Sequence, residues 1–165
     1  MAGTTQAEAP QLQRSPWRWA AAAISLTVAA AHLPLIPEHL NEAPYIGLSF
    51  IGLEFAAVGL AIALVNWDTA GTWRAAVVVP ALAVVAYLVT RTVALPEIAD
   101  DKGNWTDPLG AVALSAEVLL VIVALGHRTP SWCRSGLAAH PRRTAAVVLL
   151  AGLVATGWAI VASFA

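Results

Sequence analysis

Five long apolar stretches, separated by short polar segments, dominate the chain. We place them near Trp17–Ile36, Ile46–Asn66, Ala75–Leu95, Leu109–Gly126 and Thr144–Ala165. Each stretch holds about 18–22 residues, the length that a helix needs to cross a hydrocarbon core of about 30 Å. The apolar residues are continuous rather than alternating, which favours helices over the strands of a membrane barrel. The pattern therefore predicts an all-α membrane protein with five transmembrane helices.

Composition supports this prediction and excludes several other classes of protein. Hydrophobic residues make up 59% of the 165 residues and charged residues only 12%, with a mean hydropathy of +0.71. A soluble domain has about 25% charged residues. A net charge of −1 provides no basic surface for nucleic acid, and the single cysteine, Cys133, excludes a disulfide framework. We expect one helical transmembrane domain over residues 17–165, surrounded by the lipid bilayer, after a disordered cytoplasmic tail at residues 1–16.

The basic residues predict the orientation of the chain in the membrane. With five spans, seven arginines fall on one side, namely Arg14, Arg18, Arg74, Arg128, Arg134, Arg142 and Arg143. On the opposite side, two predicted loops, 37–45 with His39 in it and 96–108, contain six acids and only one basic residue, Lys102. The positive-inside rule then places the N-terminus in the cytoplasm and the C-terminus outside the plasma membrane. An alternative stays open, in which the segment up to Ala31 is a cleaved signal peptide and four spans remain.

The first two spans resemble the next two, which predicts an internal repeat. The matching residues are His32 and Arg91, Pro37 and Pro96, Gly47 and Gly110, and Glu54 and Glu117. In each hairpin the His or Arg lies five residues before its Pro, and the Gly lies seven residues before its Glu. Both hairpins run in the same direction. The spacing predicts a parallel repeat of two hairpins about an axis along the membrane normal, with a fifth helix outside it.

Four ionisable residues fall inside the predicted spans: His32, Glu54, Arg91 and Glu117. Placing an ionisable side chain near the bilayer centre costs on the order of 3 kcal/mol, so such residues usually face the interior of a bundle. We expect all four to converge inside the first four spans. The two glutamates are predicted near mid-membrane, and His32 and Arg91 nearer the outer surface.

The residue types of this group predict a binding site. Imidazole and carboxylate together are typical ligands of divalent transition metals. The candidate metal or ligand-binding residues are His32, Glu38, His39, Glu54 and Glu117, with Arg91 as an ion-pairing or orienting residue and Glu97 and Asp107 in an outer acidic loop. Two other interpretations stay open. In one, Arg91 forms a structural ion pair with a glutamate of the spans. In the other, the two glutamates share a proton during transport.

Two short motifs carry a resemblance to known sequences. The string His32…Pro37-Glu38-His39 and the segment Asp107-Pro108-Leu109-Gly110 resemble a group of small uncharacterised bacterial multi-pass membrane proteins of actinobacterial type. The resemblance covers about residues 30–120. It implies a small helical membrane protein and does not imply a substrate.

Taken together, the sequence predicts a multi-pass membrane protein whose polar core site opens outwards and binds a metal ion or a small cationic ligand. Because the chain has little aqueous domain to hold a substrate, we predict no enzymatic activity. Two other roles stay open at this point. One is an accessory or assembly subunit of a larger membrane complex, and the other is a small proton- or ion-coupled transporter.

Overall fold

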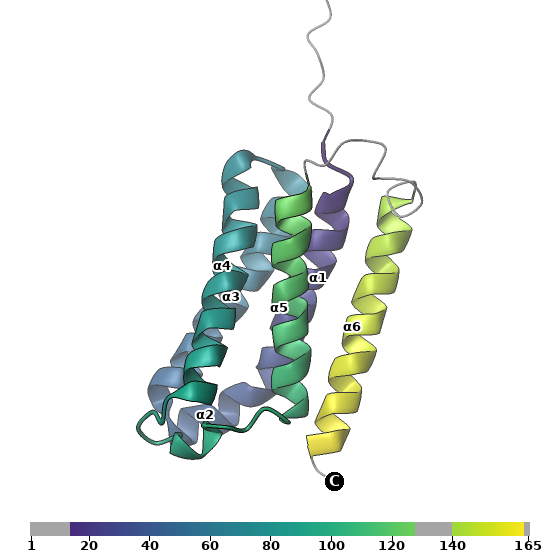
Figure 1. Cartoon of the computed structure of the whole chain (residues 1–165). Coiled ribbons are helices and arrows are strands. Elements are labelled where there is room, and N and C mark those ends of the chain that lie inside the picture. The colour runs from purple at the N-terminus through teal and green to yellow at the C-terminus, as the bar shows by residue number, and fades with distance from the viewer. Residues whose placement is uncertain (1–13, 128–139, 164–165) are drawn as a thin grey trace, which may run out of the picture.

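The computed structural model describes residues 14–127 and 140–163, which form a bundle of helices (Figure 1). The helices are α1 (Trp17–His32), α2 (Ile36–Glu42), α3 (Pro44–Asn66), α4 (Ala70–Thr92), α5 (Pro108–Gly126) and α6 (Pro141–Ser163), with 3-10 turns η1 (Leu33–Leu35) and η2 (Ala99–Asp101). The described residues contain no β-strand. The all-helical fold expected from the apolar pattern is therefore confirmed.

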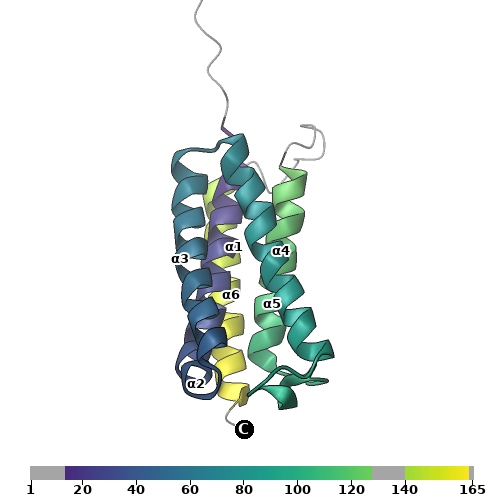
Figure 2. The same cartoon turned by 90° about the vertical axis from the view of Figure 1, so that its left-hand side faces the viewer.

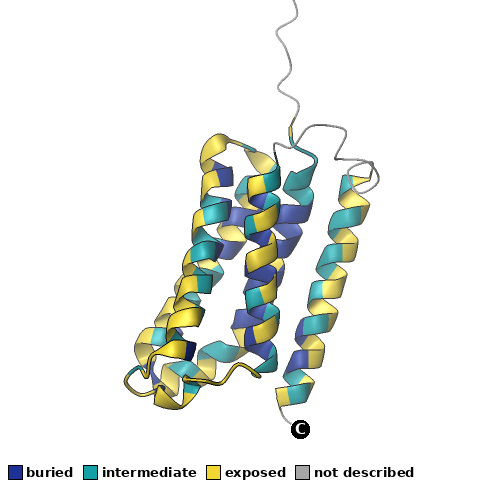
Figure 3. Cartoon of the chain, in the orientation of Figure 1, coloured by how far each residue is buried: buried dark blue, intermediate teal, exposed yellow. Residues whose placement is uncertain are grey.

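Five of these segments are long and apolar enough to cross a membrane, as predicted. Their outer faces carry large apolar side chains that packing leaves exposed, as the outward faces of α4, α5 and α6 show (Figure 3). Phe55 is 77% exposed and Val161 69% exposed. So much exposed apolar surface would be unfavourable in water, but it suits contact with lipid tails. The bundle is thus compatible with a multi-pass membrane protein.

Helix α1 is the central and most buried helix of the bundle. It packs against α3, α5 and α6, and α6 lies on the side of α1 away from α4 (Figures 1 and 2). The small residues of segment 20–23 are buried and allow neighbouring backbones to approach closely. Ser25 Oγ also donates a hydrogen bond of 2.8 Å to the carbonyl of Ala57 on α3. Cleavage after Ala31 would therefore remove the central helix of the fold.

The connection between the first two spans differs from the prediction. Segment 37–45 is predicted as a loop, but residues Ile36–Glu42 form the helix α2, so the prediction that His39 lies in a loop is wrong. Pro44 begins α3 at a position that tolerates proline. Gly47 then lets α2 lie against α3, because a Cβ atom there would be 2.7 Å from the Leu40 backbone nitrogen.

The helices run up and down, so their connections lie at two opposite ends of the bundle. These two ends differ chemically. We call the end formed by α2 and segment 93–107 the α2 end, and the other the basic end. The described arginines of the basic end are Arg14, Arg18, Arg74, Arg142 and Arg143. Arg128, Cys133, Arg134 and most of the predicted tail lie outside the described residues. The two-hairpin repeat stays a prediction, and its two connections differ, since a helix joins α1 to α3 and an irregular segment joins α4 to α5.

Candidate functional site

A cavity of about 470 Å³ lies among α1 to α5 and reaches the α2 end of the bundle. Most of its lining is apolar, from residues such as Leu53 and Val79. Polar side chains enter it from five helices and from the segment before α5. They are His32, His39, Ser49, Tyr87, Thr90, Arg91, Asp101, Asp107 and Glu117. Three of the four intramembrane residues singled out from the sequence therefore line one cavity.

The most buried polar contact of the cavity joins α1 to α5. His32 Nε2 lies 3.5 Å from Glu117 Oε1. The two residues are 6% and 2% exposed. The other ring nitrogen of His32, Nδ1, lies 2.9 Å from the carbonyl oxygen of Val28, one turn earlier on the same helix. Because a carbonyl oxygen can only accept, Nδ1 carries the proton of that hydrogen bond. Glu117 and His32 thus form a pair that faces the cavity, which we call the His–Glu pair.

Arg91 lies at the end of α4 and pairs with the segment that follows it. Its Nη1 is 2.7 Å from Asp101 Oδ1, and its Nη2 is 3.5 Å from Asp107 Oδ2. The interpretation in which Arg91 pairs with Glu54 or Glu117 is therefore wrong. The chain turns back after Thr92, at the end of α4, and this brings both aspartates to the guanidinium. Glu117 lies deeper in the bundle on α5 and contacts His32 instead.

Local structure holds this ion-paired group in place. The guanidinium of Arg91 lies over the ring of Tyr87, one turn earlier, at 4.8 Å from its centroid. Asp107 is the N-cap of α5 and accepts hydrogen bonds from the backbone amides of Leu109 and Gly110, at 3.1 and 3.0 Å. Gly110 permits this approach, because a Cβ there would be 2.7 Å from Asp107 Oδ2. Arg91 Nε is buried and has no hydrogen-bond partner in the described part of the chain.

Glu54 does not join the other three residues. It is half-buried on α3 and does not line the cavity. Its Oε1 is buried and finds no hydrogen-bond partner among residues 14–127 and 140–163. The expectation that all four residues converge is thus met by three of them. Residues of α3 that do line the cavity, such as Ser49 and Leu53, lie on a different face of the helix from Glu54.

The five predicted metal ligands are not gathered at one point. The described residues contain no group of three or more His, Cys, Asp or Glu side chains that could hold a metal ion. Glu38 is exposed on α2. The two histidines each pack against the Phe50 ring, whose centroid is 5.2 Å from that of His32 and 5.0 Å from that of His39. The arrangement therefore does not support the predicted site for a divalent transition metal.

The acidic segment divides into residues with different local roles. Glu97 is exposed, adopts a φ of 68° in a tight turn and does not line the cavity. Asp107, predicted in an outer acidic loop, lines the cavity and also caps α5. Asp101 and Tyr87 belong to the site as well, and sequence reasoning did not select them. The spacing of four between Tyr87 and Arg91 is a signal that would have found the ring, because such residues meet on one helix face.

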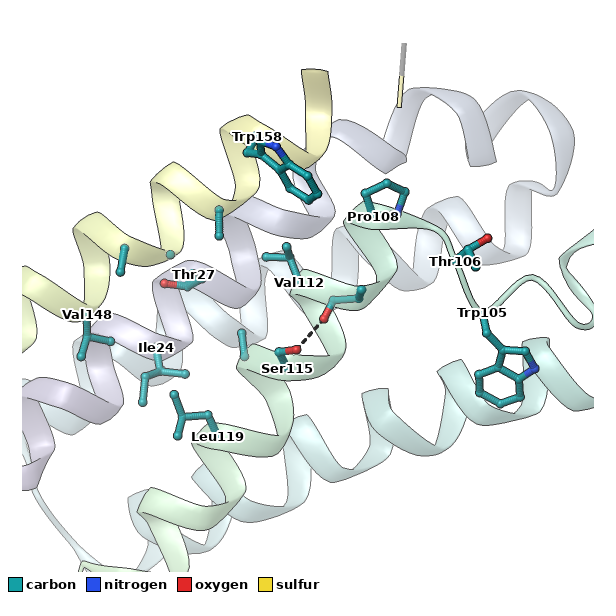
Figure 4. Close-up of a pocket in the computed structure, with 15 residues that line it drawn as sticks. Ile24, Thr27, Trp105, Thr106, Pro108, Val112, Ser115, Leu119, Val148 and Trp158 are labelled. Atoms are coloured by element: carbon teal, nitrogen blue, oxygen red, sulfur yellow. Dashed lines mark hydrogen bonds between the residues drawn. The ribbon is translucent and has the colours of Figure 1, made fainter. Parts of the chain in front are cut away.

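A second cavity of about 710 Å³ lies between α1, α5 and α6 (Figure 4). Ile24, Val112, Leu119 and Val148 point into it from the three helices. Its two helix hydroxyls are occupied, since Ser115 donates to the carbonyl of Ala111 and Thr27 to that of Ala23. This cavity therefore offers an apolar surface and little hydrogen bonding.

Comparisons with models of protein families, with curated proteins and with solved structures found no match. The resemblance to small bacterial multi-pass proteins therefore stays a prediction. The same holds for partner subunits and for the expected lack of enzymatic activity, because no finding tests them.

Proposed function

We propose that this protein binds a small organic cation with an apolar body in the cavity among α1 to α5, within the membrane. The observation that carries the proposal is the buried carboxyl group of Glu117, which lines the cavity without a basic partner of fixed charge. Ionisable groups inside a membrane bundle usually mark the path or binding site of an ion or a substrate. This proposal keeps the cationic ligand expected from the sequence and does not include a metal centre.

The balance of charges around the cavity supports a positively charged ligand. Asp101, Asp107 and Glu117 contribute three carboxyl groups to the lining, whereas Arg91 is its only Arg or Lys among the described residues. Arg91 already pairs with the two aspartates. Glu117 therefore remains available to a cation, and a cation would balance a carboxylate that is taken out of water.

The apolar and aromatic lining supports a ligand with a hydrophobic body. Pockets for small molecules combine mostly apolar walls with a few polar groups that fix orientation, and their volumes are typically about 300–1,000 Å³. The volume of about 470 Å³ agrees with this range. Phe50 and Tyr87 add aromatic side chains to this mostly apolar lining.

A matched pair of ligands tests the proposal. Benzyltrimethylammonium and neopentylbenzene have nearly the same shape, but only the first is charged. We expect the purified protein in detergent to bind the ammonium compound, and Glu117→Gln to weaken that binding by about tenfold or more, because the substitution removes the charge but keeps the shape. Isothermal titration calorimetry measures both affinities. Neopentylbenzene should bind wild type and Glu117→Gln alike.

Glu38→Gln is the matched control, since Glu38 is an exposed carboxyl group of the same end of the molecule. Its affinity for benzyltrimethylammonium should equal that of the wild type. No binding of the cation by the wild type, or equal binding by Glu117→Gln, would contradict the proposal.

A further inference from the structure

Resting on the proposed function, we infer that the His–Glu pair holds one exchangeable proton and that a bound organic cation displaces it. The protein would then exchange a cation for a proton at a single site. The argument depends on hydrogen-bonding geometry at two atoms, His32 Nε2 and Glu117 Oε1, and on the groups that surround them.

The hydrogen bond from His32 to Val28 fixes the proton on Nδ1. In a neutral ring, Nε2 then has no proton and can only accept. An ionised Glu117 also has only acceptor oxygens, so the two atoms would face each other 3.5 Å apart as two acceptors. The close contact is favourable only when one additional proton lies on Nε2 or on the carboxyl group. Before a cation binds, the His–Glu pair therefore holds one exchangeable proton and has no net charge.

Few other charged or titratable groups surround the His–Glu pair. From α2, His39 faces the cavity, and its ring and that of His32 both pack against Phe50 of α3. From α4 and the following segment, Arg91, Asp101 and Asp107 form their own ion-paired group, and Tyr87 packs beneath the guanidinium. The titratable residues of α3, Tyr45 and Glu54, do not line the cavity. Among its described residues, α6 has Arg142 and Arg143 as its charged side chains, and they lie at the basic end.

Cation binding changes the charge of this small site. When an organic cation approaches Glu117 while the proton remains, the pair and the ligand together carry one net positive charge inside an apolar cavity. Departure of the proton to water leaves a carboxylate beside the cation and a neutral imidazole, and the total charge returns to zero. The bond broken is Nε2–H or Oε–H, and the proton leaves as hydronium or on buffer. Because charge in an apolar cavity is unfavourable, proton loss accompanies binding.

Calorimetry in two buffers measures this exchange. Titrations of wild-type protein with benzyltrimethylammonium near neutral pH, in phosphate and in Tris, should give different apparent enthalpies, because Tris has the larger ionisation enthalpy. The difference should correspond to about one proton released per cation bound, and the affinity should fall about tenfold for each unit that the pH is lowered.

His32→Gln is the decisive variant. The glutamine amide donates a permanent hydrogen bond toward Glu117, so the carboxylate no longer needs a shared proton. The affinity of this variant changes, and we expect its dependence on pH to weaken and its release of protons to fall below that of the wild type. Val28 still has its helical hydrogen bond, so the helix is not interrupted.

The outcomes separate the inference from the proposed function. Cation binding by the wild type without proton release, or unchanged proton release in His32→Gln, would overturn the inference and leave the cation site in place. No binding of benzyltrimethylammonium by the wild type would overturn both. If His32→Gln does not fold, the proton count and the pH slope of the wild type decide.

Discussion

At the scale of single residues, the site contains two polar groups of different kinds. Arg91 pairs with Asp101 and Asp107, which lie close to it in the sequence, in the segment that follows α4. His32 and Glu117 come from helices far apart in the sequence and meet each other. A buried charge is unfavourable unless it is paired, and in each group the charged side chains find their partners within that group. The two groups should therefore be energetically separate, although they line the same cavity.

A pair of double-mutant cycles tests this separation. The cycle of Arg91→Ala with Asp101→Ala should give a coupling free energy of about 1–3 kcal/mol, because the two side chains are in direct contact. The cycle of Arg91→Ala with Glu117→Ala should give a value near zero. Denaturant unfolding in detergent, followed by circular dichroism, measures the four free energies of each cycle. A larger coupling for Arg91 with Glu117 than with Asp101 would contradict the assignment of partners.

The burial of the ionisable residues could be predicted from the sequence for three of the four, but their contacts could not. An ionisable residue in an apolar stretch is evident from the pattern, and Glu117, Arg91 and His32 are indeed buried. Whether a side chain meets a neighbour depends on the rotation of its helix, which packing sets. Glu54 and Glu117 have the same spacing from a glycine, yet only Glu117 lines the cavity. The identical Gly–Glu spacing in the two hairpins therefore does not predict which glutamate faces the cavity.

At the scale of helices, close contact between α1 and α6 depends on one glycine. A Cβ atom at Gly152 would overlap with Thr27 Oγ1 and Cγ2 of α1. Lipid tails are as apolar as the helix surface, so helix association in a membrane depends on such close packing more than on the exclusion of water. Gly157 lies on the same helix, and a Cβ atom there would meet no other atom within 4 Å.

We expect Gly152→Ala to destabilise the protein by about 1–3 kcal/mol, because the extra methyl group forces α6 away from α1. Adding Thr27→Ala should restore most of this loss by removing the overlapping atoms. Gly157→Ala is the control and should be neutral or stabilising by up to about 1 kcal/mol, since alanine favours a helix. Thermal unfolding in detergent compares these three variants with the wild type. A lower stability for Gly157→Ala than for Gly152→Ala would refute this account of the interface.

The spans could be predicted to within a few residues, since hydropathy and length determine them. The sequence places the second span at Ile46–Asn66, and the structure places α3 at Pro44–Asn66. Hydropathy could not predict α2, because this helix is only seven residues long and is too short to cross a membrane. It ends at Glu42, two residues before Pro44. Its helical form depends on packing against α3 near Gly47, a contact that hydropathy does not report.

At the scale of the whole molecule, the two ends differ in how they hold charge. At the basic end, Trp19 lies under two guanidinium groups, with Arg18 at 5.5 Å and Arg142 at 5.0 Å from its ring centroid. Asp68 accepts a hydrogen bond of 2.6 Å from the indole nitrogen of Trp73. Aromatic and cationic side chains of this kind are enriched where a helix leaves the hydrocarbon core. The α2 end instead carries the acids of α2 and of segment 93–107.

The same asymmetry predicts the orientation in the cell membrane. Arginines concentrate in short loops on the cytoplasmic side, so the basic end should face the cytoplasm and the α2 end the outside. Cys133, outside the described residues, is then a native cytoplasmic reporter, because it lies between α5 and α6. In intact cells it should react with membrane-permeant maleimides only.

Ala99, which is exposed in η2 at the α2 end, provides the matched reporter. In a Cys133→Ser background, Ala99→Cys should be labelled by an impermeant maleimide in intact cells, whereas wild-type Cys133 should be labelled by it only after the membrane is opened. The opposite pattern would place the basic end outside. The cavity reaches the α2 end, so the observed pattern would also fix the side on which a cation from water meets Asp101 and Asp107 before it reaches Glu117.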